Sequence, residues 1–79
     1  MPAPGPTPRD VAIRAGEEVI RLGQFLKLSG EVLSGAEAKE LLAAGLVTVN
    51  GEPEERRGRQ LRRGDVVDVA DGDGPLRVA

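Results

Sequence analysis

The sequence predicts an α+β fold in which two helices pack on a small antiparallel β-sheet. Three observations predict it. Apolar residues recur with helical spacing in two consecutive segments within residues 21–44, and short alternating apolar runs follow from residue 47 to residue 69. An Asn-Gly pair also separates two of the extended runs, which is the strongest short-range signal for a hairpin. Helices followed by strands indicate an α+β arrangement.

The composition excludes several kinds of active site. A chain of 79 residues forms one small domain. It has no cysteine and no histidine, so thiol nucleophiles, Ser-His triads and the usual zinc sites are excluded. A catalytic pair of carboxylates needs a pocket that shifts their pKa values, and so small a core leaves little room for one. We therefore expect a protein that is not an enzyme and that needs no cofactor or metal.

The hydropathy pattern offers no membrane segment. No apolar run approaches the roughly 20 residues that span a bilayer, and the N-terminal stretch lacks the apolar centre of a signal peptide. We therefore expect a cytoplasmic monomer with no membrane contact and no small-molecule substrate.

Composition divides the chain into three parts. Residues 1–10 contain four of the six prolines and predict a disordered leader. Residues 11–70 hold the periodic segments and predict the folded domain. Residues 71–79 combine glycines, a proline and acids, which predicts a loose acidic tail, with residues 76–78 as a candidate for one last short strand.

The first predicted helix covers residues 21–29 and follows two short extended pieces, at 11–13 and 19–20. Its apolar residues share one helical face and are Leu22, Phe25 and Leu26. Phe25 is the only aromatic residue, and its spacing places it in the core, not on the surface where it could stack on a base. After Gly30, which is suited to end the helix, Val32 and Leu33 are expected to pack against the core.

The second predicted helix has clear signals at both ends. Ser34 is a good N-cap, and Glu37 three residues later completes a capping box. Gly45 follows the helix where a left-handed backbone is needed, and Leu46 is placed to contact the last helical turn, as in a Schellman motif. The predicted buried stripe consists of Ala38, Leu41 and Leu42.

A hairpin and a closing strand follow. Residues 47–49 alternate as a half-buried strand, and Asn50-Gly51 predicts a type I′ turn. Pro53 cannot donate to a ladder, so the returning strand should lie at an edge. Residues 63–65 predict a second turn, and residues 66–69 predict a strand with two valines on one face.

A run of arginines is the sharpest candidate binding feature. Five arginines and no acid lie between residues 56 and 63, namely Arg56, Arg57, Arg59, Arg62 and Arg63. The net charge of −2 argues against nucleic acid, but electrostatic binding depends on where charges lie. The run is framed by strands, Leu61 can anchor it, and the planar guanidinium suits phosphate and bases. The neighbouring Glu54 and Glu55 are placed to neutralise part of this charge.

The start of the second helix offers another place for phosphate. Backbone N–H groups at a helix N-terminus favour anions, and Gly35 would let a phosphate approach closely. Lys39 lies one turn later. Both residues also have ordinary explanations: glycine as a permissive first-turn residue, and lysine as a surface partner of nearby acids.

These motifs together resemble the RNA-binding domain named after the fourth small-subunit ribosomal protein, the S-four (S4) domain. The likeness covers about residues 20–69, and the stretches LGQFLKL, SGAEAK and VNGEPEERRGRQL resemble small stand-alone bacterial members. The residues that carry it are Arg21-Leu22, Leu26, Ser34, Ala38, Leu41-Leu42, Gly45, Val47, Val49-Asn50-Gly51, Leu61, Gly64-Asp65 and Val67.

The resemblance implies non-catalytic binding of structured RNA, either ribosomal or transfer RNA, in ribosome assembly or translation. Many members carry arginine directly after the serine that begins the second helix, whereas this chain has Gly35, so the helix contact differs. The candidate RNA-binding residues are Lys27, Gly35, Lys39, Asn50, Arg56, Arg57, Arg59 and Arg62. For Asn50 and Gly51, a purely structural role in their turn is the favoured alternative.

Two other functions remain open from the sequence. The arginine loop could bind an acidic protein, which salt-sensitive binding to RNA alone would distinguish. A β-grasp sulfur carrier also shows a VNG hairpin and a Gly-Asp turn, but its chemistry needs a C-terminal Gly-Gly. This chain ends in Leu76-Arg77-Val78-Ala79 instead.

Overall fold

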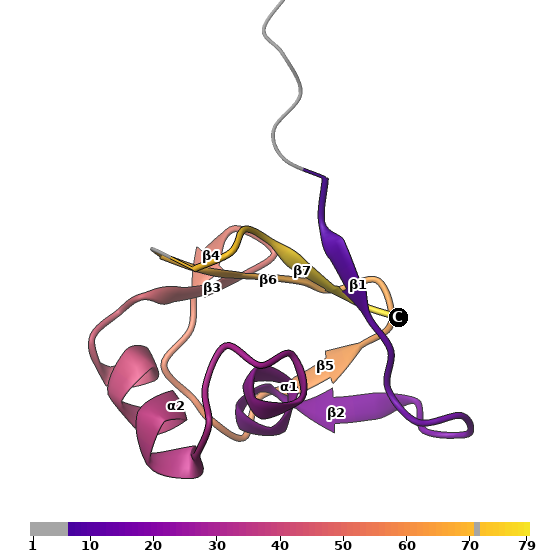
Figure 1. The fold of residues 1–79 in the computed structure, drawn as a ribbon, viewed down its shortest axis with the longest axis horizontal. Helices are drawn as coiled ribbons and strands as arrows, with labels where there is room; N and C mark the ends of the chain where they lie inside the picture. Colours follow the sequence, from indigo (N-terminus) through magenta and orange to yellow (C-terminus); the bar gives the residue numbers. More distant parts are fainter. Residues whose placement is uncertain (1–6, 71) are drawn as a thin grey trace, which may run out of the picture.

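The computed structural model describes residues 7–70 and 72–79 and confirms the predicted α+β class. Two helices lie against one face of a five-stranded sheet, and a separate two-stranded sheet flanks the first helix (Figure 1). The elements in chain order are β1 (Arg9–Val11), β2 (Val19–Arg21), α1 (Leu22–Leu28), α2 (Gly35–Ala43), β3 (Val47–Val49), β4 (Glu52–Pro53), β5 (Gln60–Arg62), β6 (Val66–Val69) and β7 (Leu76–Val78).

The larger sheet is mixed, whereas the sequence predicted an antiparallel one. Its strand order is β1-β7-β6-β3-β4, and only β1 with β7 is parallel. The other three pairs are antiparallel: hairpins join β3 to β4 and β6 to β7, whereas β3 and β6 are joined by the segment that contains β4 and β5. No hairpin joins β1 to β7, which come from opposite ends of the chain, so a turn does not set their direction. The second sheet pairs β2 with β5 in antiparallel register, with Ile20 opposite Leu61.

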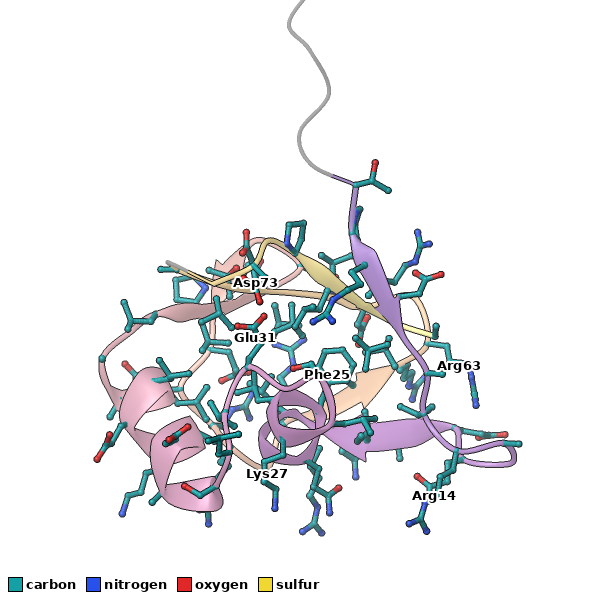
Figure 2. All side chains as sticks on the ribbon, in the orientation of Figure 1. Arg14, Phe25, Lys27, Glu31, Arg63 and Asp73 are labelled. Atoms are coloured by element: carbon teal, nitrogen blue, oxygen red, sulfur yellow. The ribbon has the colours of Figure 1, made fainter. Side chains whose placement is uncertain are left out.

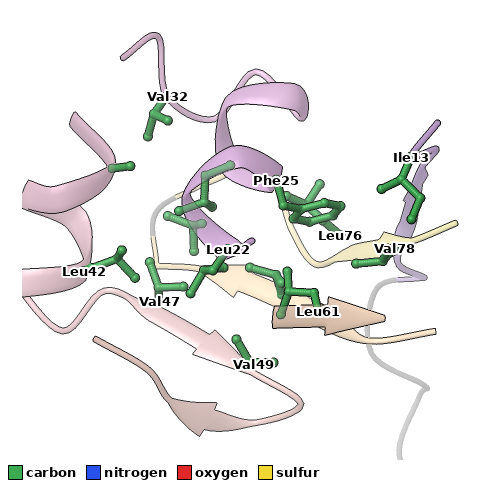
Figure 3. Close-up of a cluster of buried hydrophobic side chains, with 14 residues drawn as sticks. Ile13, Leu22, Phe25, Val32, Leu42, Val47, Val49, Leu61, Leu76 and Val78 are labelled. Atoms are coloured by element: carbon green, nitrogen blue, oxygen red, sulfur yellow. The ribbon is translucent and has the colours of Figure 1, made fainter. Parts of the chain in front are cut away.

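The hydrophobic core fills the space between the helices and the sheets (Figure 3). Leu22, Phe25 and Leu26 of α1 are fully buried, which confirms the predicted helix face and the core position of the only aromatic ring. Leu61 is also fully buried and anchors β5 beneath α1. Burial of side chains of this size contributes roughly 1.5–3 kcal/mol each, so these contacts hold the two sheets and α1 together.

The ends of α2 have the predicted caps, with one difference. The Ser34 hydroxyl accepts the Glu37 N–H at 3.2 Å, but the Glu37 carboxylate accepts from the N–H of Leu33, one residue before the expected one. At the other end Gly45 has φ of 74°, and the Leu46 N–H donates to the Leu41 carbonyl. This hydrogen bond is the one that defines a Schellman motif.

The predicted hairpin turn is present between β3 and β4. Asn50 and Gly51 both have positive φ, 51° and 83°, as a type I′ turn requires. The Asn50 side chain also connects this turn to the turn that precedes β6. Its oxygen accepts the Val66 N–H at 2.9 Å, and its nitrogen donates to the Asp65 carboxylate at 3.2 Å. Pro53 lies in the edge strand β4, as predicted.

Both ends of the domain differ from the sequence-based division. Residues 1–6 of the predicted leader and Asp71 of the predicted tail lie outside the described residues. Arg9 and Asp10, however, belong to β1, and Leu76–Val78 forms the interior strand β7. Leu76 and Val78 are buried, so this segment is part of the core and not a loose tail.

Two further observations concern exposure and membranes. Val32 packs in the core, but Leu33, predicted to do the same, is 87% exposed because the turn into α2 directs it outward. Neither helix of the described chain has the length and apolar character to cross a membrane.

Candidate nucleic-acid interface

The segment that carries three of the arginines, residues 54–59, is termed the arginine loop, and it is docked on the start of α1. The Leu22 N–H donates to the Arg59 carbonyl at 2.8 Å, and the Gly23 N–H donates to the Arg57 carbonyl at 2.9 Å. The first N–H groups of a helix have no partner within the helix. The loop therefore caps α1, and α1 in turn holds the loop.

Gly23 makes room for Arg57. A Cβ atom at position 23 would lie 2.5 Å from Arg57 Cγ, which is closer than such atoms approach. The arginine stem thus lies directly over the helix backbone, and only glycine permits that approach. Gly23 was not among the residues predicted for the site. The sequence feature that could have identified it is a glycine in the first turn of a predicted helix. Glycine lowers helix stability at such a position, so its presence there indicates another role.

The buried carboxylate of Glu54 holds the arginine loop together by hydrogen bonds. Glu54 is 7% exposed, and its carboxylate accepts five hydrogen bonds. Two come from the backbone N–H groups of Glu55 and Arg56, two from the Arg56 guanidinium and one from the Arg59 guanidinium at 3.0 Å. Hydrogen bonds from the Arg56 side chain and backbone lower the pKa of Glu54 to about 2, against the opposing effect of burial.

Beside the loop lies a concave surface that we term the basic pocket. Arg21 and Lys27 reach it from the two ends of the β2–α1 segment, and Arg57 reaches it from the arginine loop. Its lining consists of Arg21, Gly23, Gln24, Lys27, Gly35, Arg57 and Gly58. The lining includes three cations and no acid. Its three basic side chains are exposed, and none forms an ion pair with another described residue.

The basic pocket also borders the start of α2. The position of a Cβ atom on Gly35, the first residue of α2, would be 3.7 Å from Arg57 Nη1. Lys27 extends from α1 on the side away from Phe25 and the core (Figure 2). Cations and the positive end of a helix therefore face the same space, which suits a phosphate group.

Three of the predicted site residues, Lys27, Gly35 and Arg57, meet in this pocket although they are distant in sequence. Arg56 and Arg59 border a neighbouring depression that shares Gly58 with it. Both are paired with Glu54, so their charge is partly neutralised, as the sequence suggested it could be. Arg21 and Gln24 were not predicted, because their position depends on how β2 runs into α1.

The structure does not bring the other three predicted residues into the basic pocket. Lys39 is exposed on α2 but does not line the pocket. The Asn50 amide is occupied by Asp65 and Val66 and therefore has a structural role. Arg62 is exposed on β5 opposite Val19, at the other end of the strand pair from Arg21.

Arg63, the last arginine of the run, also has a structural role. Its guanidinium donates to the carbonyl oxygens of Arg14 and Glu17 and so holds the turn before β2 (Figure 2). The arginine run is therefore divided: Arg57 lines the basic pocket, whereas Arg63 holds a remote turn.

Folding also separates part of the negative charge from the basic pocket. Three acids, Glu31, Glu37 and Glu40, line a depression along α2 together with apolar side chains. The basic pocket has no acid in its lining. A chain with net charge −2 can therefore present a cationic surface locally. Among the described residues, no group of three or more acidic side chains is arranged to hold a metal ion.

Comparison with known proteins identifies the family. The model of the S4 domain matches residues 11–78. The chain is also similar to a Bacillus subtilis (strain 168) protein named "Probable ribosome maturation protein RlbA". The two are 51% identical over 61 residues, which cover 77% of this chain and 84% of that protein. The match includes both helices and all strands except part of β1. On this evidence, the chain belongs to the S4 domain family.

Proposed function

We propose that this protein binds structured RNA, ribosomal or transfer RNA, without catalysing a reaction on it. The observation that carries the proposal is the basic pocket, in which Arg21, Lys27 and Arg57 converge with no acid in the lining. Its membership of the S4 domain family supports RNA as the ligand. The name of its relative refers to ribosome maturation, which supports ribosomal RNA as the first RNA to test and the cytoplasm as the location.

The proposed contacts follow from the geometry. Lys27 and Arg57 bind a backbone phosphate at the basic pocket, and Gly35 lets that phosphate approach the first N–H groups of α2. Arg21 contacts the next phosphate on the same strand. Arg56 uses Nε and Nη2 to bind Glu54, and its remaining guanidinium N–H groups are available to a further phosphate.

The remaining predicted residues have weaker support. Lys39 and Arg62 stay as peripheral contacts, because both are exposed but lie outside the basic pocket. Asn50 is left out of the proposed contacts, since its amide already binds Asp65 and Val66. Contacts of this kind read the backbone and the shape of folded RNA more than its sequence.

The direct test is equilibrium binding of the purified protein to fragments of ribosomal RNA at two salt concentrations. With about three phosphate contacts, a fourfold increase in salt should lower affinity about 15- to 40-fold. The variant Lys27→Glu/Arg57→Glu should lose this binding. Arg14→Glu changes an exposed arginine outside the basic pocket and serves as the charge-matched control for each substitution.

The alternative, an acidic protein partner, predicts a different result. A folded wild-type protein that does not bind RNA at low salt would contradict the proposal and favour the protein partner. Equal weakening by Arg14→Glu and by a single Arg57→Glu would show that net charge, and not the basic pocket, determines binding.

A further inference from the structure

Glu54 is a buried acid that binds two arginines beside the surface proposed to bind a polyanion. It is the one charged residue among the described residues that is buried. Each donor to its carboxylate belongs to the arginine loop, from Glu55, Arg56 or Arg59. On charge alone, this carboxylate should weaken binding to phosphate, because it neutralises part of the neighbouring positive charge.

The geometry gives Glu54 the opposite effect. By accepting the N–H groups of Glu55 and Arg56, its carboxylate closes a local turn at the start of the arginine loop. Its bond from Arg59 closes the other end of the same loop. Between these two points, the carbonyls of Arg57 and Arg59 accept the first two N–H groups of α1. The path of the loop over Gly23 is therefore fixed from both sides.

The carboxylate also orients the guanidinium of Arg56. It binds Nε and Nη2 from the inner side, at 3.2 Å each, while the Arg56 side chain remains 77% exposed. A guanidinium has five N–H donors, so three point away from Glu54. An arginine held in this way loses less conformational freedom when it binds a phosphate, because it is ordered before binding.

We propose that Glu54 is a positioning residue for RNA binding. Its carboxylate holds the arginine loop on α1, so that Arg57 lies over Gly23 in the basic pocket and Arg56 presents its outer N–H groups to phosphate. This inference rests on the proposed function. It adds that a negative charge strengthens binding to a polyanion here, which a count of charges would not predict.

The test compares Glu54→Gln with Glu55→Gln. Both remove one negative charge from neighbouring positions, but the exposed Glu55 side chain makes no hydrogen bond to another described residue. Affinity for a ribosomal RNA fragment should fall about tenfold in Glu54→Gln, as expected when one charge-assisted hydrogen bond to phosphate is removed. In Glu55→Gln it should stay the same or rise. A fall in affinity in Glu54→Gln without a fall in Glu55→Gln, at equal net charge, separates positioning from electrostatics.

The salt dependence distinguishes positioning from a simple loss of folded protein. Partial unfolding lowers affinity equally at all salt concentrations and leaves the slope of log affinity against log salt unchanged. A misplaced Arg56 or Arg57 no longer neutralises its phosphate, so the slope should become shallower by about 1 for each phosphate that is released. Circular dichroism on the same samples measures the folded fraction.

A second variant covers the case in which Glu54→Gln does not fold. Glu54→Asp keeps the charge but shortens the side chain, so it cannot reach all five donors. It should bind more weakly than wild type with a shallower salt slope. Wild-type affinity and slope in both Glu54 variants would overturn the positioning role alone. Absence of salt-sensitive binding by the wild-type protein would overturn the proposed function and this inference with it.

Discussion

The arginines at residues 56–59 and those at residues 62–63 belong to one run in the sequence but to two regions in the structure. The first group lies in a loop docked on α1, and Arg57 reaches the basic pocket. In the second group, Arg63 binds the carbonyls of Arg14 and Glu17, away from that pocket. A run of like charge therefore does not define a binding surface by itself.

The two regions differ in what surrounds each guanidinium. Arg57 lies over a glycine and beside the start of α2, with no partner acid among the described residues. Arg63 is oriented by two backbone carbonyls of its own chain and so has fewer donors left for a ligand. We therefore expect binding energy to depend on the first region and folding energy on the second.

Charge reversal should show the largest difference between the regions. Arg57→Glu should lower RNA affinity about 10- to 100-fold, because it removes a charge-assisted hydrogen bond worth roughly 1.5–3 kcal/mol. Arg62→Glu makes the same change in net charge at the exposed surface of β5 and should have a much smaller effect. Fluorescence anisotropy with one ribosomal RNA fragment measures both. Equal losses would remove the distinction between the two regions.

A methyl group at position 23 should produce a smaller loss of RNA affinity. Gly23→Ala places an atom where Arg57 Cγ now lies, so Arg57 keeps its charge but must move. We expect affinity to fall on the order of tenfold or less. Stability should change little, because the helix preference of alanine, worth up to about 1 kcal/mol relative to glycine, opposes the cost of displacing Arg57. Gly58→Ala, where no atom lies within 4 Å of the new group, adds a methyl group to the pocket lining without displacing Arg57, so it separates loss of space in the pocket from movement of Arg57.

Low pH should reveal how much Glu54 stabilises the arginine loop. Its pKa is about 2 in the folded protein, against an ordinary value of 4.5 that applies to the unfolded chain. Between these two pH values the unfolded chain therefore binds more protons than the folded protein. The free energy of unfolding should therefore decrease as pH falls through this window. Wild type should be more stable than Glu54→Gln near neutral pH by on the order of 1–2 kcal/mol, since exposed Arg56 is a partly screened partner.

The difference in the free energy of unfolding between wild type and Glu54→Gln reports on Glu54 alone, because all other carboxylates titrate in both proteins. Urea unfolding at a series of pH values should show the two stabilities converging between about pH 4.5 and about pH 2. A constant difference across this range would mean that ionised Glu54 does not stabilise the fold.

The smallest expected effect concerns Arg63. Arg63→Ala removes two hydrogen bonds to the turn before β2 and should lower the free energy of unfolding by about 0.5–1.5 kcal/mol. RNA affinity should change little. Arg62→Ala, at the next exposed arginine, should alter stability by less than about 0.5 kcal/mol. Thermal melts together with the binding assay measure both quantities, and a clear loss of RNA affinity in Arg63→Ala would extend the interface to the second region.

The parts of the fold that the sequence predicted well depend on local signals. The Schellman end of α2 needs Gly45, the type I′ turn needs Asn50 and Gly51, and each conformation is specified within a few residues. The face of α1 followed from spacing alone, because Phe25 and its neighbours repeat with a helical period.

The parts that it did not predict depend on distant contacts. β1 and β7 are three-residue strands whose pairing joins the two ends of the chain, and neither has a turn that would indicate the other. Leu33 was misplaced because the direction of one connector residue follows from how Glu37 caps α2.

The candidate site shows the same limit. Lys27 and Arg57 could each be suggested from composition, but their meeting depends on the loop docking over Gly23. The engagement of Asn50 with Asp65 also required the tertiary structure, since 15 residues separate them.

The most direct test of the basic pocket is to map the backbone amide NMR signals of the protein as a ribosomal RNA fragment is added. We expect the largest shifts at the basic pocket, in Gln24, Lys27, Gly35, Arg57 and Gly58, with little change at Arg14, Glu17 and Arg63. Shifts concentrated at the Arg63 turn, or no shifts at low salt in a folded protein, would contradict the assignment of the basic pocket as the RNA-binding site.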